Sequence, residues 1–284
     1  MITIENGRTL QNTVVVSLVI RSDSSPIPIT MEADIRALDG VEKWMEEGRT
    51  VSVGKYEFEI VKSRLASGLV QQGDKDTGGY SITCLMKGTK SIALPMARNV
   101  FKEKPTIQDC YRLSGAEANV FGSVMGQRFA LLRGDLPTPM INRVLQEAGA
   151  IVRWKKGKIQ ALTYPEIVAQ KPVRFLPDIQ GADDEMTFVA RNEMPQYVSM
   201  DESRNVVQVA RSVPSPVYFI PHHDARSVRL MQQTIIQRRI AKIMLDMNID
   251  AGDIVDVNGE KLIVVTAAHV PIDGYTKLWL GSIE

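Results

Sequence analysis

The chain has 284 residues, of which 44% are hydrophobic and 24% charged, a composition typical of a folded globular protein that excludes a disordered or fibrous one. Its 34 basic and 33 acidic residues leave a net charge of +1, which argues against a protein that coats nucleic acid or binds a charged membrane surface. The length predicts about two domains. Two cysteines, Cys84 and Cys110, are too few for a disulfide framework, so we expect free thiols in a reducing compartment.

The N-terminal third of the chain predicts a β-rich, barrel-like domain. Tyr56, Phe58 and Ile60 alternate with acidic residues, and this period of two is typical of a half-buried strand. The same alternation over 80–86 places Cys84 on an apolar face, where we expect a buried and unreactive thiol. Further strands are expected at 13–20, 28–35 and 50–53, and a polar, glycine-rich loop at 71–79.

A short helix followed by a hairpin is predicted in the middle of the chain. Apolar residues recur at helical spacing over 138–148, with Thr138 as the expected N-cap and Gly149 as the terminating residue. A hairpin at 150–162 follows, with a lysine–glycine turn between its strands. Four prolines and an acidic cluster over 165–202 predict an irregular excursion.

The C-terminal part predicts strands around one long helix. No proline or glycine occurs from 225 to 248, and apolar residues recur there at three- and four-residue steps. We therefore expect an amphipathic helix over this range, capped by Asp224, that buries a stripe including Ile240 against the following sheet. Asn258-Gly259 is a strong hairpin signal, because both residues tolerate positive φ. Strands are expected at 206–210, 217–220, 254–257, 262–266 and 275–280.

These elements together predict a mainly β protein with some α structure, in the α+β class. Its parts would be barrel-like β domains, one long amphipathic helix in the C-terminal region and a small helix-plus-hairpin unit. We expect an N-terminal barrel-like domain at 1–104, a middle α+β domain at 105–205, and a second barrel-like domain at 206–284.

The sequence holds no recognised motif for catalysis, cofactors or metals. Phosphate-cradling and dinucleotide-binding glycine patterns are absent, as are the signatures of serine hydrolases and zinc sites. His222-His223 is the only metal-like cluster, but adjacent residues rarely bind one ion together, and we interpret it as a polar loop before a capped helix. We predict no catalytic residue, no cofactor and no structural metal.

Basic residues surround an aromatic residue on the predicted hairpin, at Arg153, Trp154, Lys155, Lys156 and Lys158. Such a group can bind single-stranded nucleic acid by stacking. The interpretation that we favour over this is a solvated turn whose tryptophan packs inward. A third interpretation is a protein-interaction tip that meets an acidic patch of another subunit, such as 183–185. These five residues are the candidate interface.

Several features follow one another in a fixed order near the C-terminus. The long predicted helix leads into a glycine–aspartate strand start at 252–253, a valine-rich strand at 262–265, His269 and a tyrosine-bearing strand at 274–278. This layout resembles the central hub proteins of contractile phage tails and related injection machines, including the hub part of the type VI secretion spike. The helix-plus-hairpin unit at 138–162 is similar to one that recurs in those hubs.

The resemblance implies a homotrimer in which two barrel-like domains of each subunit form a six-fold-like ring. Its partners would be a hexameric tail tube protein on one side and a trimeric spike protein on the other, and contact with a tape measure protein is left open. The chain would match symmetries in the tail or baseplate of a virion, after synthesis in the host cytoplasm, without a membrane or sequence-specific nucleic acid as partner. The residues themselves leave open a nucleic-acid-binding module that uses the hairpin 153–158, and an undetected hydrolase.

Overall fold

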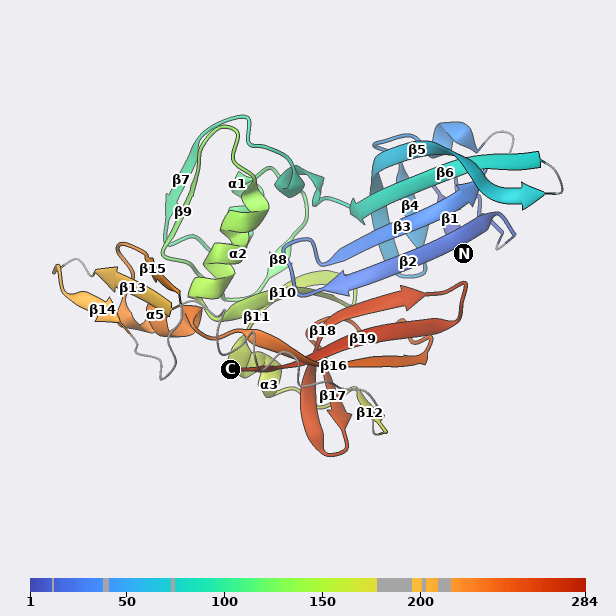
Figure 1. Cartoon of the computed structure of the whole chain (residues 1–284). Helices are drawn as coiled ribbons and strands as arrows, with labels where there is room; N and C mark the ends of the chain where they lie inside the picture. The colour runs from blue at the N-terminus through green and yellow to red at the C-terminus, as the bar shows by residue number, and fades with distance from the viewer. Residues whose placement is uncertain (12, 38–40, 73–74, 178–195, 201–202, 209–215) are drawn as a thin grey trace.

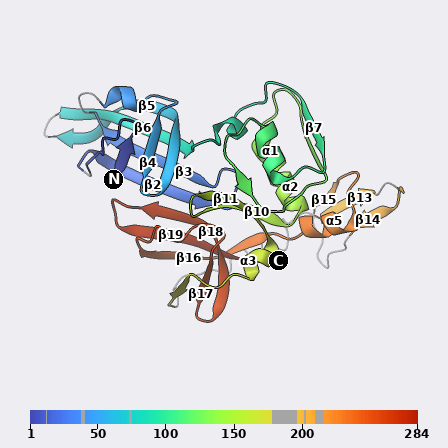
Figure 2. The same cartoon turned by 180° about the vertical axis from the view of Figure 1, so that it is seen from behind.

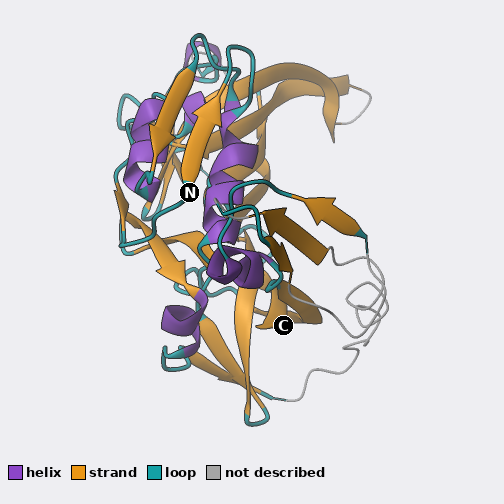
Figure 3. Cartoon of the chain, turned by 90° about the vertical axis from the view of Figure 1, so that its left-hand side faces the viewer, coloured by secondary structure: helices purple, strands orange, loops and turns teal. Residues whose placement is uncertain are grey.

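A computed structural model gives the structure of the chain and describes all of it except residues 12, 38–40, 73–74, 178–195, 201–202 and 209–215. Strands are the main secondary structure of the described chain, and its helices are short (Figure 3). One large curled sheet joins strands from both ends of the chain, and the middle elements pack beside it (Figure 1). The predicted mainly β, α+β class is confirmed, whereas the division into three domains remains a prediction.

The N-terminal strands form the curled end of the large sheet. Tyr56, Phe58 and Ile60 are all buried, as their alternation predicted. The loop predicted at 71–79 is wrong at the residues that the structure describes, which exclude 73–74. β5 continues to Gln72 and β6 begins at Lys75, because antiparallel pairing overrides the weak strand propensity of glycine. The strands are β1 (Ile2–Ile4), β2 (Val15–Asp23), β3 (Ile29–Arg36), β4 (Thr50–Val53), β5 (Tyr56–Gln72) and β6 (Lys75–Met86), in the sheet order β1-β4-β5-β6-β3-β2.

The C-terminal strands continue the same sheet. They are β12 (Arg174–Leu176), β16 (Ile235–Met244), β17 (Ile254–Val257), β18 (Glu260–Val270) and β19 (Tyr275–Ile283). The predicted turn between β17 and β18 is confirmed, with φ of 53° at Asn258 and 88° at Gly259. β18 pairs antiparallel with β2, from Thr266 opposite Asp23 to His269 opposite Ile20. This pairing connects the two ends of the chain through backbone hydrogen bonds, and both views show β18 beside β2 (Figures 1 and 2).

The middle of the chain forms a separate cluster of helices and short strands with its own core. The predicted helix and hairpin are confirmed, but the N-cap is Leu136 rather than Thr138, because Pro137 already occupies the first helical turn. Thr138 instead donates a hydrogen bond to the carbonyl of Ile92, at 2.6 Å. The elements are β7 (Val100–Glu103), α1 (Ile107–Leu113), β8 (Val120–Phe121), β9 (Arg128–Leu131), α2 (Pro137–Glu147), β10 (Ala150–Lys155), β11 (Lys158–Thr163) and α3 (Tyr164–Val168).

A small three-stranded sheet packs on a helix at the far end of the molecule (Figure 1). Its strands β14 (Val206–Gln208) and β15 (Val217–Phe219) fall within two of the predicted strands. The third strand, β13 (Gln196–Met200), lies between them. Asp224 caps α5 (Ala225–Met231), as predicted, by accepting a hydrogen bond from the backbone N–H of Ser227.

The predicted helix over 225–248 is wrong beyond its first two turns. α5 ends at Met231, and β16 pairs with β19 from Ile235 to Met244. A bulge between Gln237 and Arg239 shifts the strand by one residue, so apolar positions on either side of it fall at spacings that imitate a helix. Ile240, predicted to be in the core, is 40% exposed for this reason.

The strand assignment predicts effects of different size at two isoleucines of β16. Ile236→Ala, at a side chain that is 7% exposed, should lower the free energy of unfolding by roughly 2–5 kcal/mol. Ile240→Ala should lower it by about 1 kcal/mol or less, because that residue is 40% exposed and loses less buried apolar contact. Urea unfolding of the two variants measures the difference. A larger loss at Ile240 than at Ile236 would contradict the assignment.

Candidate functional site: a buried polar joint

The hairpin β10–β11 contacts both the N-terminal strands and the C-terminal strands of the large sheet. Its turn is formed by Lys156 and Gly157, which both have positive φ. Trp154 is 4% exposed and belongs to the N-terminal hydrophobic core, with its ring 4.8 Å from that of Tyr56. The inward packing of the tryptophan, favoured from the sequence, is confirmed. The hairpin therefore connects the middle of the chain to the N-terminal sheet through a buried aromatic pair.

Two basic side chains of the hairpin point into the start of the C-terminal sheet. Arg153 is buried and donates hydrogen bonds to Oδ1 of Asp253, at 3.2 Å, and to the carbonyl of Gly252, at 3.0 Å. Lys155 donates to Oδ2 of Asp253 and lies 3.4 Å from Oδ2 of Asp250. Both carboxylates are 1% exposed, so each of them needs these cations as partners.

The N-terminal sheet supplies the remaining partners of Asp250. Its Oδ1 accepts a hydrogen bond from the hydroxyl of Tyr56, at 2.8 Å, and its Oδ2 lies 3.2 Å from the ammonium group of Lys55. That ammonium group is also 4.9 Å from the ring of Trp154. Two buried carboxylates thus meet three cations that come from β10 and from the β4–β5 turn. We call this group of residues, Lys55, Tyr56, Arg153, Lys155, Asp250 and Asp253, the polar joint.

Gly252 is required by the geometry of the joint. It has a φ of 78°, and a Cβ placed there would lie 2.8 Å from Cδ of Arg153 and 3.1 Å from Cδ1 of Ile151. A larger residue would be strained in this conformation and would push the arginine away from Asp253. The glycine–aspartate pair noted in the sequence is therefore a position where the middle hairpin and the C-terminal part approach each other closely.

Burial is the main cause of the pKa shifts of three residues in the polar joint. Burial raises the pKa of Asp250, while the ammonium groups of Lys55 and Lys155 act against that rise. Burial and the neighbouring Asp250 raise the pKa of Tyr56, which therefore stays protonated and donates its hydrogen bond. Burial lowers the pKa of Arg153, and the charges of Asp253 and Asp250 oppose this. The joint is therefore a set of paired opposite charges, and it holds no free nucleophile.

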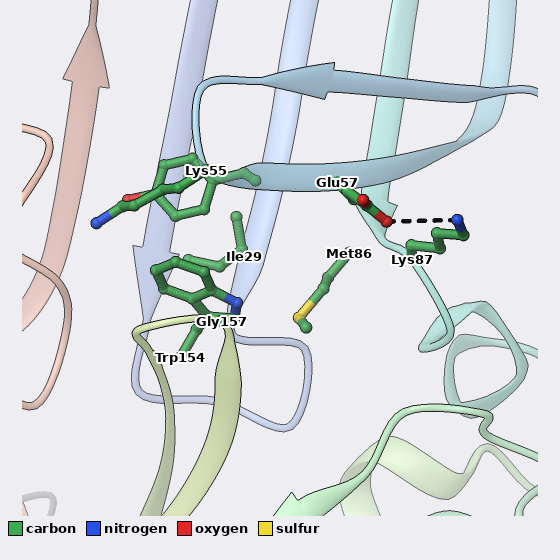
Figure 4. Close-up of a pocket in the computed structure, with 8 residues that line it drawn as sticks. Ile29, Lys55, Glu57, Met86, Lys87, Trp154 and Gly157 are labelled. Atoms are coloured by element: carbon green, nitrogen blue, oxygen red, sulfur yellow. Dashed lines mark hydrogen bonds and ion pairs between the residues drawn. The ribbon is translucent and has the colours of Figure 1, made fainter. Parts of the chain in front are cut away.

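A cavity of about 330 Å³ lies beside the joint. Figure 4 shows Trp154 and Ile29 at one end of it and Met86 between them and the ion pair of Glu57 with Lys87. The carboxylate and ammonium of that pair are 3.3 Å apart and largely exposed. The walls offer neither a cluster of metal ligands nor a paired acid and base, so we assign the cavity no chemistry.

The candidate interface residues divide between the interior and the surface. Arg153, Trp154 and Lys155 are used inside the chain, as described above, whereas Lys156 and Lys158 at the tip are exposed. The ammonium group of Lys158 lies 5.2 Å from the ring of Phe121, which is 50% exposed. The acidic patch 183–185 lies outside the described residues. A contact of the hairpin with another subunit remains a prediction. Of the five candidate residues, only Lys156 and Lys158 are exposed and could make it.

A second polar cluster, not anticipated from the sequence, involves one of the two adjacent histidines. Nε2 of His223 lies 2.8 Å from Oε1 of the buried Glu147, and Nδ1 lies 2.9 Å from the carbonyl of Pro221. Both ring nitrogens thus face acceptors, which only the doubly protonated imidazolium satisfies. Arg143 on α2 also contacts Glu147, at 3.3 Å. The cluster attaches the small three-stranded sheet and α5 to α2.

The other titratable groups singled out in the sequence are buried and unreactive. Burial raises the pKa values of Cys84 and Cys110 to about 12, and these two free thiols lie in different hydrophobic cores. Burial and the charge of Lys55 lower the pKa of His269 to about 4, so it is neutral at pH 7. Its Nδ1 lies 3.0 Å from the hydroxyl of Thr276. Within the described residues, no three potential ligands gather to hold a metal ion.

Comparison with known proteins identifies the fold. The chain matches a tail protein of Neisseria meningitidis MC58 with a TM-score of 0.65 and 13% identity, over 99% of this chain and 96% of that one. It matches the 43 kDa tail protein of prophage MuSo2 from Shewanella oneidensis with a TM-score of 0.64 and 9% identity, over 99% and 97%. The chain has the fold of phage tail proteins.

The likeness extends to a secretion machine. An E. coli component of the type VI secretion system, described as structurally similar to the T4 bacteriophage tail proteins gp27 and gp5, matches with a TM-score of 0.53 and 12% identity, over 99% of this chain and 76% of that one. Neither a protein-family model nor a curated protein sequence matches the chain. In the described part of the chain, no helix is long and apolar enough to cross a membrane.

The polar joint predicts a large effect of removing one carboxylate. Asp253→Ala would leave Arg153 and Lys155 without their shared partner in a buried site, and we expect it to lower the free energy of unfolding by roughly 3–5 kcal/mol. Lys156→Ala, on the exposed turn of the same hairpin, should change it by about 0.5 kcal/mol or less. Denaturant titration compares the two, and equal effects would show that the joint does not stabilise the fold.

The contact of His223 predicts that stability falls with rising pH. Burial lowers the pKa of His223, but the hydrogen bond and charge of Glu147, together with the hydrogen bond to the carbonyl of Pro221, more than offset this, so the folded pKa lies above its ordinary value. Such a contact stabilises the fold fully below about pH 6.5, and its contribution is lost as the pH rises through the folded pKa. The loss is about 1.4 kcal/mol per unit of pKa difference.

The melting temperature of the chain from pH 6 to 9 measures this loss. His223→Gln keeps one polar contact without a titrating group, so it should remove this component of the pH dependence. A variant with the same slope as the parent chain would contradict the assignment.

Proposed function

We propose that the chain is a structural component of a phage tail or a related contractile injection machine. The observation that carries this proposal is the extent of the likeness, which covers 99% of the chain and 96–97% of two tail proteins. The buried polar groups support it, because they hold parts of the chain together and none is arranged as a nucleophile with a base. On this proposal the chain performs no turnover.

Within the tail, the position that fits best is the central hub of the baseplate. A homotrimer of this chain would place two β bodies per copy around a ring, the N-terminal strands forming one and the C-terminal strands the other. Such a ring would match a hexameric tail tube protein on one side and a trimeric spike protein on the other. The pairing of β2 with β18 supports this role, because it makes both bodies of one copy parts of a single sheet.

The structure gives less support to the nucleic-acid-binding alternative. Trp154 would have to leave the N-terminal core to stack on a base, and Arg153 and Lys155 would have to give up their buried carboxylates. Only Lys156 and Lys158 of the five candidate residues would remain for phosphate contacts. A nucleic-acid shift assay at moderate salt separates the two functions, since the hub predicts no salt-sensitive binding by the isolated chain.

The hub proposal predicts a trimer whose assembly depends on the hairpin tip. Light scattering coupled to size-exclusion chromatography should give the mass of three chains, in the isolated protein or after addition of the tube or spike protein. Reversing Lys156 and Lys158 to glutamate should weaken this assembly while the melting temperature stays unchanged, because both side chains are exposed.

Reversal of Lys261, an exposed lysine in the first residues of β18, is the matched control. A chain that stays monomeric with both partners present would contradict the hub. A trimer that is insensitive to the tip reversal would contradict only the role of the tip.

A further inference from the structure

The small three-stranded sheet and α5 form a unit with its own core. The described residues between 196 and 231 comprise β13, β14, β15 and α5, and we call them the small unit. Figures 1 and 2 both show it at the end of the molecule away from the N-terminal strands. Within the described residues, its apolar core is separate from that of the middle elements, and it consists of Tyr197, Ile220, Val228 and Met231.

Polar contacts attach the small unit to α2. Nε2 of Gln146 donates to the hydroxyl of Tyr197, at 3.0 Å, and to the carbonyl of Met231, at 3.1 Å. One residue further along α2, the carboxylate of Glu147 lies 2.8 Å from Nε2 of His223. Parts of a chain that meet through polar contacts, without a shared apolar core, can move relative to each other.

The connection from the small unit to the large sheet is short and fixed at its far end. α5 ends at Met231, and β16 begins at Ile235. Between them, the backbone of Thr234 exchanges two hydrogen bonds with that of Glu284, each of 3.0 Å. Residues 232–233 are therefore the position about which the small unit can turn while β16 stays in the sheet.

The contact of His223 with Glu147 depends on a proton. Its two ring nitrogens face two oxygen acceptors, Oε1 of Glu147 and the carbonyl of Pro221. A neutral imidazole has one N–H, so loss of the proton leaves a nitrogen lone pair facing one of these oxygens. The buried Glu147 then also loses a cationic partner, and Arg143 remains beside it at 3.3 Å.

The charged groups around His223 come from α2, from the strands β7 and β9, and from its own loop. They are Glu147, Arg143, Glu103, Lys104, Arg128, His222 and Asp224. Glu103 and Arg128 pair with each other, at 3.8 Å. Burial and, least of all, the charge of Arg143 lower the pKa of His223, whereas the hydrogen bonds to Glu147 and Pro221 and the charge of Glu147 raise it above its ordinary value. Glu147 is therefore the group that favours the imidazolium most.

We propose that His223 and Glu147 form a proton-controlled latch for the small unit. The protonated latch holds the unit on α2. Loss of the proton lets the unit open about residues 232–233, while the large sheet and the middle elements stay folded, as in local opening of other proteins. Because the contact stabilises the closed form only while His223 is protonated, opening increases as the pH rises. The latch does not depend on the tail role proposed above.

Spin labels on either side of the contact measure the opening directly. Leu132→Cys lies just after β9 and Val206→Cys lies on β14, at residues that are 65% and 72% exposed. Cys84 and Cys110 are buried and escape labelling. Pulsed electron paramagnetic resonance on the full chain should show one distance at pH 6 and a second, longer one at pH 9. The open-to-closed ratio should rise up to about tenfold for each unit by which the pKa of His223 is higher in the closed form.

The adjacent histidine is the matched control, because His222 is exposed. His223→Gln should make the distances independent of pH, whereas His222→Gln should keep the response of the parent chain. Glu147→Gln should move the opening to lower pH, because the acceptor remains but its charge is lost. Labels at Leu132→Cys and Lys261→Cys, which join the middle elements to the large sheet, should keep one distance throughout.

Three results would overturn the latch. The first is a distance between the labels at 132 and 206 that stays the same from pH 6 to pH 9. The second is a pH response that survives His223→Gln, or that does not move in Glu147→Gln. The third is a change between the labels at 132 and 261 at the same pH, because the chain would then unfold as a whole.

Discussion

The buried carboxylates of Asp250 and Asp253 determine how the parts of this protein fit together. A carboxylate buried without a cation carries a large desolvation cost, so each needs partners that stay in place. Those partners are Lys55 in the β4–β5 turn and Tyr56 at the start of β5, together with Arg153 and Lys155 on the hairpin β10–β11. The N-terminal sheet, the middle hairpin and the C-terminal strands must therefore adopt one mutual arrangement for all these contacts to form.

The backbone pairing of β2 with β18 depends on the same arrangement. The backbone N–H of Ala251, between the two joint carboxylates, donates to the hydroxyl of Ser22 on β2, at 2.9 Å. The hydroxyl of Thr266 donates to the carboxylate of Asp23, the next residue of β2, at 2.6 Å. An apolar contact of the same area could slide, whereas a charge network with few satisfying geometries fixes the register. In the tail role proposed above, such a joint would hold the two β bodies of one copy in a defined arrangement.

Local signals in the sequence were sufficient for much of the fold. The alternation around Tyr56, the cap at Asp224 and the turn at Asn258-Gly259 each depend on neighbouring residues only, and each prediction holds. The helix predicted over 225–248 failed because a bulge displaces the strand pattern by one residue, and the bulge is specified by pairing with β19. Periodicity alone cannot distinguish that shifted strand from an amphipathic helix.

The polar joint was beyond sequence reasoning for a related reason. Lys55, Lys155 and Asp250 are far apart in the chain, and no spacing pattern connects them. The basic hairpin looked like a surface patch, because nothing local shows that Arg153 and Lys155 face buried acids. The one available signal was the Gly252-Asp253 pair, since a glycine before an acidic residue at a strand start suggests a close approach. No sequence pattern around His223 or Glu147 indicates the contact between them, because the two residues are far apart in the chain.

Electron cryo-microscopy of the assembled particle tests the proposal that this chain is a tail hub whose parts are held together by the polar joint. We expect three copies around the tail axis, between the tube and the spike, with β2 paired to β18 inside each copy. Absence of the chain from the particle, or a position away from the axis, would contradict the hub. Copies in which β2 and β18 separate would contradict the rigid joint.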